Sequence, residues 1–178
     1  MASFNSDFYD PATNKWGARR SAPHFHRLAA AGVIGGKFYV AGGVGSTEGN
    51  LEKILDEHPL PAAQIGIGHT RWATHGPPND VNAHPHTGDA RRVALVHNGI
   101  IENFAVLRAE LERLGHEMQS ETDTEVAAHL LARAYAEVGD LSAAMCAVAR
   151  RLEGTFTLLA VHADAPDVVV GARHDSPL

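Results

Sequence analysis

The chain has 178 residues, 44% of them hydrophobic, which suffices for one main core and an appendage but not for two full domains. Its formal net charge of −6 comes without a cluster of Lys or Arg, which argues against nucleic acid and membrane surfaces as partners. No apolar stretch is long enough to span a bilayer and no secretory signal opens the chain, so we expect a cytoplasmic protein.

The first 46 residues predict short β-strands. Residues 8–16 predict a strand, a turn and a strand, and residues 29–43 predict a hairpin that turns at Gly35 and Gly36. The sequence YDP, the following Trp16, the strand GKFYV and two closing glycines together resemble a single kelch repeat. One repeat cannot close a propeller, and the composition changes near residues 46–50. We therefore predict a kelch-like segment over residues 1–46 and a second unit over residues 47–178.

The second unit begins with a predicted amphipathic helix at residues 51–58. Residues 65–68 and 93–97 predict two strands, each of which leads directly into a polar motif. Asn103 is expected to cap a further helix that ends at Gly115. The buried face of that helix is expected to carry Phe104, Leu107, Leu111 and Leu114.

Two more helices and two strands complete the prediction. The sequence TDTE at residues 122–125 has the form of a capping box, and Asp140 and Gly154 are expected to bound the last helix. Residues 155–161 and 168–172 predict strands around a turn at residues 164–167, so the fold class is α+β, with helices layered on antiparallel strands. The last helix is expected to bury a stripe beside Cys146, made of Leu141, Met145, Val148 and Leu152.

Several polar residues are suited to bind an amino acid. Arg71 leaves a predicted strand, where its guanidinium could hold a carboxylate through two parallel hydrogen bonds. Asp123 is either a helix cap or a receiver for a substrate ammonium group. Asn98 and Gly99 offer a side-chain amide and a backbone N–H for a developing oxyanion, but Asn-Gly is also typical of a tight turn.

The polar motifs occur in a fixed order that carries a family resemblance: GHTRWATHG at residues 68–76, NAHPH at 82–86, HNGIIEN at 97–103, SETDTE at 120–125, RLEG at 151–154 and SPL at 176–178. From about residue 50 to residue 178 the chain closely resembles the glutaminase domains of glutamine–fructose-6-phosphate aminotransferases. The resemblance implies a truncated N-terminal-nucleophile αββα sandwich, here preceded by the kelch-like segment.

The resemblance also implies a ligand and roles for individual residues. L-Glutamine would be held by Arg71 at its carboxylate and by Asp123 at its amino group, while Asn98 and Gly99 would form the oxyanion hole. The pocket would be lined by a loop containing Trp72, Thr74 and His75. No metal or other cofactor is implied, and the implied partners are the family's isomerase domains or a protein bound by the kelch-like segment.

One departure from the family bears directly on catalysis. The family starts with a cysteine directly after the initiator Met, whereas position 2 here is Ala. Ser3 would need an additional cleavage to become the first residue, and Cys146 lies within a predicted helix without a group that would activate its thiol. We therefore expect negligible glutaminase activity, which leaves open whether the chain is an enzyme. A hairpin at residues 33–40 is expected to occupy the place of the family's missing strand.

Two alternatives to a glutaminase domain remain at this point. The first is a non-catalytic module that binds an amino acid, or that binds a protein through the kelch-like segment. The second is a metal-dependent hydrolase, although its histidines lack the helical i, i+4 spacing of many zinc sites. Its candidate ligands are His69, His75, His84, His86 and His97.

Overall fold

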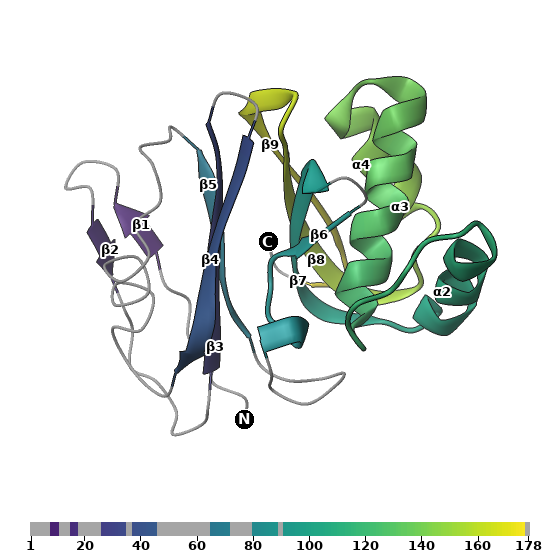
Figure 1. Ribbon diagram of the computed structural model, residues 1–178, viewed down its shortest axis with the longest axis horizontal. Coiled ribbons are helices and arrows are strands. Elements are labelled where there is room, and N and C mark those ends of the chain that lie inside the picture. Colours follow the sequence, from purple (N-terminus) through teal and green to yellow (C-terminus); the bar gives the residue numbers. More distant parts are fainter. Residues whose placement is uncertain are drawn as a thin grey trace.

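The computed structural model describes residues 8–10, 15–17, 26–34, 37–45, 65–71, 80–88 and 91–176, with the backbone alone described in the first four ranges and at residues 70, 71 and 80. The helix expected at residues 51–58 lies outside the described residues. Figure 1 shows three layers side by side: a three-stranded sheet, a four-stranded sheet and a layer of helices. None of the described helices is long and apolar enough to cross a membrane.

The three-stranded sheet joins the N-terminal segment to the rest of the chain. It has the order β4-β3-β5 and is antiparallel throughout. The predicted hairpin is confirmed, since Ile34 pairs with Lys37, and β3 also pairs with β5, so that Arg27 lies opposite Arg71. This pairing crosses the predicted boundary after residue 46, and the hairpin is paired as our replacement hypothesis requires. The strands are β3 (His26–Ile34), β4 (Lys37–Gly45) and β5 (Gly66–Arg71).

The expected kelch-like blade is not supported by the described strands. Strands β1 (Phe8–Asp10) and β2 (Lys15–Gly17) pair with each other, with Tyr9 opposite Trp16, as the strand-turn-strand prediction required. They form their own two-stranded sheet, whereas β3 and β4 belong to the sheet that contains β5. A propeller blade is a single four-stranded sheet. The four N-terminal strands therefore do not make one blade.

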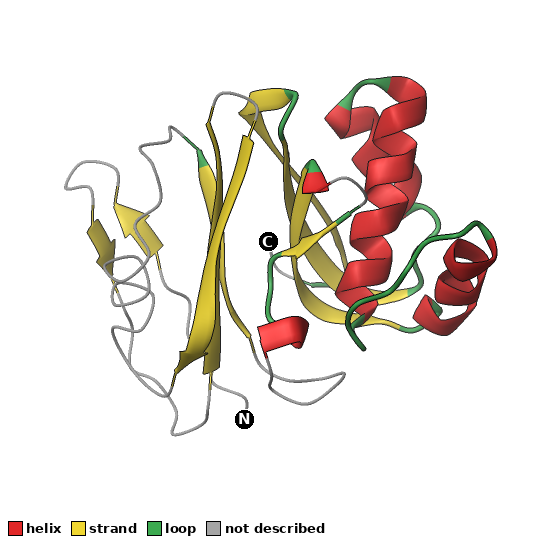
Figure 2. Ribbon diagram, viewed as in Figure 1, coloured by secondary structure: helices red, strands yellow, loops and turns green. Residues whose placement is uncertain are grey.

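The four-stranded sheet has the order β6-β7-β8-β9 and is also antiparallel. A short 3-10 helix, η1 (Asp80–Asn82), precedes this sheet. Figure 2 shows that the three α-helices lie on one face of the sheet. The strands are β6 (His86–Thr87), β7 (Val93–Ile101), β8 (Gly154–His162) and β9 (Ala165–His174). The helices are α2 (Phe104–Arg113), α3 (Asp123–Val138) and α4 (Leu141–Ala149).

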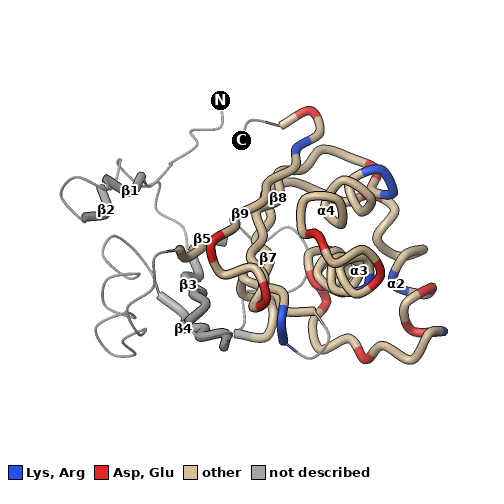
Figure 3. The backbone as a smooth tube through the Cα atoms, turned by 90° about the horizontal axis from the view of Figure 1, so that it is seen from above, with Lys and Arg blue, Asp and Glu red and all other residues tan. Residues whose placement is uncertain are grey.

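Strand β7 is buried on both faces, which explains its uninterrupted apolar start. Side chains alternate along a strand, so Val93 and Leu95 face the helices while Ala94 and Val96 face β5. Neither β7 nor β8 carries a charged residue, and Figure 3 shows both central strands without charge colours. The core between the two sheets also contains Ile67, Val161 and Ala163. The apolar composition of the first half of β7 therefore agrees with its buried, central position in the sheet.

Several local predictions need correction. Leu114 is not on the buried face of α2, because it is the C-cap residue and is 53% exposed, although Leu107 and Leu111 are buried as expected. The stripe on α4 is buried as predicted, yet Cys146 is exposed rather than in core surroundings, since it points to another side of the helix. The helix α4 ends at Ala149, well before Gly154.

The last hairpin is also tighter than predicted. The turn consists of Ala163 and Asp164 instead of residues 164–167, and β9 already begins at Ala165. Strand β9 is the edge of its sheet, where Pro166 is tolerated because an edge strand leaves half of its backbone N–H groups unpaired. Residues 165–167, which we assigned to the turn, therefore belong to β9.

Candidate functional site

The central strand β7 opens to the surface at one place. It is buried from Val93 to His97, exposed from Asn98 to Ile100, and buried again at Ile101. Strand β6 pairs only with Ala94 and Leu95, so no described strand lies beside the rest of this edge of β7. We call this exposed stretch of β7, residues 98–100, the opening. Two of the predicted site residues, Asn98 and Gly99, lie in it.

The side chain of Asn98 reaches across to the other sheet. Because Asn98 has the same parity as Ala94 and Val96, it lies on the face of β7 that is turned toward β5. There His69 places its Nε2 atom 2.8 Å from Asn98 Oδ1. This contact joins β5 to β7 through two side chains.

The backbone N–H groups of β7 alternate between its two edges. The N–H of Ile101 donates to Asp123 Oδ2 at 2.9 Å, and the N–H of His97 makes a longer contact of 3.5 Å to His84 Nδ1. Both groups therefore point away from β8 and toward the open edge. By alternation, the N–H of Gly99 belongs to the same edge, between these two.

Gly99 has a backbone conformation that only glycine adopts easily. Its φ is +119°, and an ideal Cβ on it would overlap the carbonyl oxygen of Thr155 and lie 2.9 Å from Phe156 Cα. Gly99 is nevertheless paired with Phe156 inside the sheet, and Asn98 is paired with Thr157. The alternative of a tight Asn-Gly turn is thus wrong, because both residues belong to a continuous strand.

Asp123 is the first residue of α3 and is only 3% exposed. Its Oδ2 accepts the Ile101 N–H, while its Oδ1 lies 3.4 Å from Thr124 Oγ1 and 3.7 Å from His97 Nδ1. The His97 Nδ1 atom is itself 3.0 Å from Thr124 Oγ1. The carboxylate therefore joins the start of α3 to the end of β7, and it does not cap its own helix. That cap is Thr122, whose side chain accepts the N–H of Glu125 at 3.2 Å.

The predicted capping box is only half formed. The Glu125 side chain does not return to Thr122 and instead accepts the N–H groups of Gln119 and Ser120, both at 2.7 Å, and the Ser120 hydroxyl at 2.6 Å. Burial alone would raise the pKa of Glu125, but contacts with His129 and Ser120 and the two backbone donors outweigh it and lower the pKa to about 2. Glu125 is therefore ionised and holds the SETDTE motif in place.

Four of the five histidines proposed as metal ligands do gather in space. The ring of His84 lies 4.3 Å from that of His69, 5.2 Å from that of His86 and 6.4 Å from that of His97, measured between centroids. His86 Nε2 also lies 2.9 Å from Thr122 Oγ1. Within the described part of the chain, however, no three His, Cys, Asp or Glu side chains are arranged to hold a metal ion. The rings pack against one another and against neighbouring polar groups.

The remaining predicted residues are Arg71 and three residues that follow it in the sequence. Arg71 is the last residue of β5, as predicted, and only its backbone is described. Trp72, Thr74 and His75 lie outside the described residues. The motif that contains all four begins within β5, and its second residue, His69, contacts Asn98.

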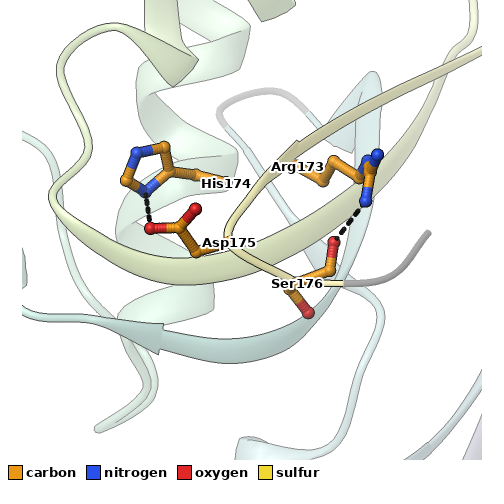
Figure 4. A pocket seen from close by; sticks show the side chains of 4 residues that line it. All are labelled: Arg173, His174, Asp175 and Ser176. Carbon is orange, nitrogen blue, oxygen red and sulfur yellow. Dashed lines mark hydrogen bonds and ion pairs between the residues drawn. The ribbon is translucent and has the colours of Figure 1, made fainter.

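A hollow lies at the C-terminal end of β9. Figure 4 shows Arg173 turned toward Ser176 and His174 turned toward Asp175. Arg173 Nη1 donates to the Ser176 carbonyl at 3.1 Å, and the His174 and Asp175 side chains are 4.0 Å apart. Its lining is mostly exposed, and His174 Nδ1 lies 2.8 Å from the Gly154 carbonyl oxygen, so we assign no function to it.

Two partnerships at the site were missed from the sequence. The contact of His69 with Asn98 and the bond from Ile101 N–H to Asp123 both join segments far apart in the chain. A signal for the first was present: Ile67 and His69 share one face of β5, as Val96 and Asn98 share one face of β7. Only the packing of the two sheets shows that these faces meet.

Comparison with known proteins gives consistent matches. The family profile described as a glutamine amidotransferase domain matches residues 56–174. The chain is 72% identical over 129 residues to the glutamine–fructose-6-phosphate aminotransferase (isomerizing) of Streptomyces coelicolor, covering 72% of this chain and 21% of that protein. It is 61% identical over 133 residues to the enzyme of the same name from Leifsonia xyli, covering 73% and 22%. The chain thus spans about a fifth of the length of these relatives.

Solved structures agree with this assignment. The glutamine phosphoribosylpyrophosphate amidotransferase of B. subtilis, complexed with ADP and GMP, superposes with a TM-score of 0.60 and 26% sequence identity. The match covers 77% of this chain and 29% of that one. A structure described as the allosteric regulatory enzyme of purine biosynthesis gives a TM-score of 0.61 at the same identity and coverage. The family match begins at residue 56, so the kelch-like interpretation of residues 1–46 rests on those residues alone.

Proposed function

Since the chain belongs to the glutamine amidotransferase domain family, we propose that it binds L-glutamine at the opening in β7 and, without an N-terminal cysteine, does not hydrolyse it. The observation that carries this proposal is the order of the polar groups along the open edge of β7. The Asn98 amide and the Gly99 N–H come first, and the Asp123 carboxylate stands beside Ile101. A hydrogen-bond donor pair and a carboxylate therefore lie along one edge of β7.

The spacing of these groups suits an amino acid with a side-chain amide. Two residues of a strand span about 7 Å, which separates the N–H of Gly99 from that of Ile101. An extended glutamine covers this span between its side-chain amide and its amino group. In the proposed pose, Asn98 and Gly99 hold the amide oxygen of glutamine. Asp123 receives its ammonium group and Arg71 holds its carboxylate. The adjoining loop contributes Trp72, Thr74 and His75.

The same groups explain why binding and turnover are separable. Oxyanion donors lower the energy of a tetrahedral intermediate, but this intermediate forms only when a nucleophile attacks the amide carbon. Ala2 follows the first residue, and neither it nor the exposed Cys146 on α4 supplies an activated thiol at the opening. We therefore propose a recognition domain with the N-terminal-nucleophile sandwich fold, in the cytoplasm and without a cofactor.

We propose the sugar-phosphate chemistry of the aminotransferases for the family and not for this chain by itself. The match covers only 21% of the Streptomyces coelicolor relative, and transfer of nitrogen to fructose 6-phosphate would require the isomerase domains of such relatives in addition to this chain. A second candidate function is a non-catalytic module that binds a protein through residues 1–46. The observation that favours it is the β1–β2 hairpin, which pairs with no other described strand.

Isothermal titration of the purified chain with L-glutamine, together with an ammonia-release assay on the same sample, tests the proposal. We expect binding without ammonia release, and a loss of at least about tenfold in affinity for Arg71→Ala, because an arginine–carboxylate pair is worth more than a neutral hydrogen bond. Arg113→Ala, at an exposed position on α2, is the matched control and should leave binding unchanged. Ammonia release by the unmodified chain would refute inactivity, and absence of binding would refute glutamine recognition.

Restoring the missing nucleophile is a second test of the proposed oxyanion hole. A chain whose first 46 residues are replaced by a segment that begins Met-Cys and supplies a matching strand should release ammonia from glutamine. If this replacement folds, binds glutamine and still releases none, the placement of Asn98 and Gly99 as the oxyanion hole is wrong.

A further inference from the structure

The amide of Asn98 can serve an oxyanion only in one of its two orientations. A carboxamide has an oxygen that only accepts hydrogen bonds and an NH₂ group that only donates them, and a half-turn exchanges the two. For an oxyanion, Nδ2 has to face the opening and Oδ1 has to be held elsewhere. Asn98 is exposed at the opening, so its own strand does not impose this choice.

We infer that His69 is a positioning residue, which donates from Nε2–H to Asn98 Oδ1 and so turns the Asn98 NH₂ group toward the ligand. The inference rests on the proposed function, and it adds to it a residue outside the oxyanion hole itself. The atoms concerned are 2.8 Å apart, a normal length for a hydrogen bond between a nitrogen and an oxygen. His69 touches the ligand-binding group and not the ligand.

The placement of His69 follows from the packing of the two sheets. Ile67 and His69 lie on one face of β5, and Ile67 is buried together with Ala94 and Val96 of β7. The next position along each strand on the same face is His69 on one sheet and Asn98 on the other. The apolar contacts of Ile67 therefore set the distance at which the polar pair meets.

A second histidine holds the ring of His69 from the side. The His84 ring lies 4.3 Å from the His69 ring at an interplanar angle of 40°, and His84 is only 5% exposed. His84 Nδ1 faces the N–H of His97 at 3.5 Å, which is compatible with a neutral ring whose Nδ1 accepts. The backbone of β7 thus supports His84, His84 packs against His69, and His69 orients the side chain of the next residue in β7.

The alternative arrangement is chemically distinct. If His69 carried its proton on Nδ1, its Nε2 atom would accept a hydrogen bond, and the Asn98 amide would have to turn its NH₂ group toward His69. The opening would then present the Asn98 oxygen, which repels an oxyanion. The tautomer of His69 and the orientation of Asn98 are therefore one property of the site.

Nitrogen NMR on the full chain distinguishes the two arrangements. A long-range proton–nitrogen correlation at slightly alkaline pH reports which nitrogen of a neutral imidazole carries the proton, and the His69 signals are the ones lost in His69→Gln. We expect the proton on Nε2. A proton on Nδ1 with a bare Nε2 would overturn the inference.

Hydrogen exchange of that proton gives a second readout. In Asn98→Leu, which removes the acceptor, exchange of the His69 Nε2–H with water should accelerate about tenfold, the effect of losing one hydrogen bond. Gln119→Leu, the same change at an exposed amide away from the opening, is the matched control and should leave it unchanged. Equal exchange in the unmodified chain and in Asn98→Leu would also overturn the inference.

Glutamine titrations connect this orientation to ligand binding. His69→Leu should weaken binding about fivefold, whereas His69→Gln, which retains an N–H donor, should stay within about twofold of the unmodified chain. Equal losses in both variants would mean that His69 acts only by filling space. If the unmodified chain binds no glutamine, the proposed function fails, while the tautomer and the exchange rate still decide the orientation of Asn98.

Discussion

At the scale of single residues, the region around the opening holds several polar groups that are buried and fully engaged. Glu125 is 4% exposed and accepts hydrogen bonds from two backbone N–H groups and one hydroxyl. Such a carboxylate stabilises the fold as long as it is ionised, because its donors would otherwise be buried without an acceptor. The loop that leads to Asp123 is thereby fixed by the residue two positions after it.

The contribution of Glu125 to stability should depend on pH. Its pKa is about 2 in the folded chain against an ordinary value of 4.5, so the stabilisation is fully present above about 4.5 and is lost as the pH falls toward 2. We expect Glu125→Gln to lower the free energy of unfolding by about 1–3 kcal/mol at neutral pH. This difference from the unmodified chain should shrink below pH 4.5.

Urea unfolding of both chains at several pH values measures the effect. Glu121→Gln is the matched control, because Glu121 is a neighbouring glutamate with an exposed side chain. It should change the free energy of unfolding by less than about 0.5 kcal/mol. A difference for Glu125→Gln that stays constant down to pH 2 would show that the charge of Glu125 does not contribute.

The backbone of Gly99 gives a second prediction at this scale. Gly99→Ala combines an unfavourable φ with an overlap between the new Cβ and the Thr155 carbonyl oxygen, so we expect a loss of at least about 2 kcal/mol. Gly115→Ala is the control, since Gly115 also has a positive φ of +91° but open space around the Cβ position. It should cost about 1 kcal/mol. Equal losses in urea unfolding would mean that β7 and β8 separate easily at this point.

At the scale of elements, the first residues of the helices show how tertiary contacts replace local ones. Asn103 precedes α2 and was expected to cap it, but its side chain makes no cap hydrogen bond. Its Nδ2 donates to the Arg151 carbonyl at 2.8 Å, and its Oδ1 accepts the Glu153 N–H at 3.1 Å. Asn103 therefore ties the end of β7 to the segment between α4 and β8.

Replacement of Asn103 by aspartate separates these two roles. A cap would be retained, since Asp and Asn are equally good N-cap residues, but the bond to the Arg151 carbonyl would be lost. We expect Asn103→Asp to destabilise the chain by about 1–2 kcal/mol in thermal or urea unfolding. Asp140→Asn is the control at a true cap, where Asp140 accepts the Ala143 N–H, and it should be nearly neutral. A neutral Asn103→Asp would argue for the cap.

At the scale of the whole molecule, the N-terminal segment is part of the architecture. Strand β3 lies between β4 and β5, so the sheet that faces β7 depends on residues before the predicted boundary. Without β3, strand β5 would become a lone strand with unpaired N–H and C=O groups. Ile67, which belongs to the core between the sheets, would then lie on a strand without a neighbour. His69 belongs to the same strand, so the opening depends on this pairing as well.

Two truncated chains test this dependence. A chain that starts at Ser21 lacks β1 and β2 but keeps β3, and we expect deuterium uptake at residues 66–71 to match that of the full chain. A chain that starts at Thr47 lacks β3 and β4, and uptake in the same peptide should be at least about tenfold faster, because its backbone hydrogen bonds to β3 are gone. Equal protection in both truncated chains would show that β5 is held without β3.

The elements with a clear periodicity were predictable from the sequence alone. The apolar start of β7, the buried stripe of α4 and the hairpin of β3 and β4 follow from side-chain alternation, helical spacing and a Gly-Gly turn, which are local properties. The order of the polar motifs also predicted the family that the profile match then confirmed. The kelch-like resemblance, carried by a few common residues over one short segment, received no such support.

Only the tertiary structure decided how the polar residues are partnered. Asn103 and Glu125 have the right residue type and position for local caps, yet each bonds to a distant or preceding backbone group because packing brings that group closer. Asn98-Gly99 resembles a turn but continues a strand, since β8 pairs with it through residues more than 50 positions away. Sequence patterns report periodicity within one element, whereas hydrogen-bond partners depend on which faces meet, and this is settled by the packing of two sheets and a helical layer.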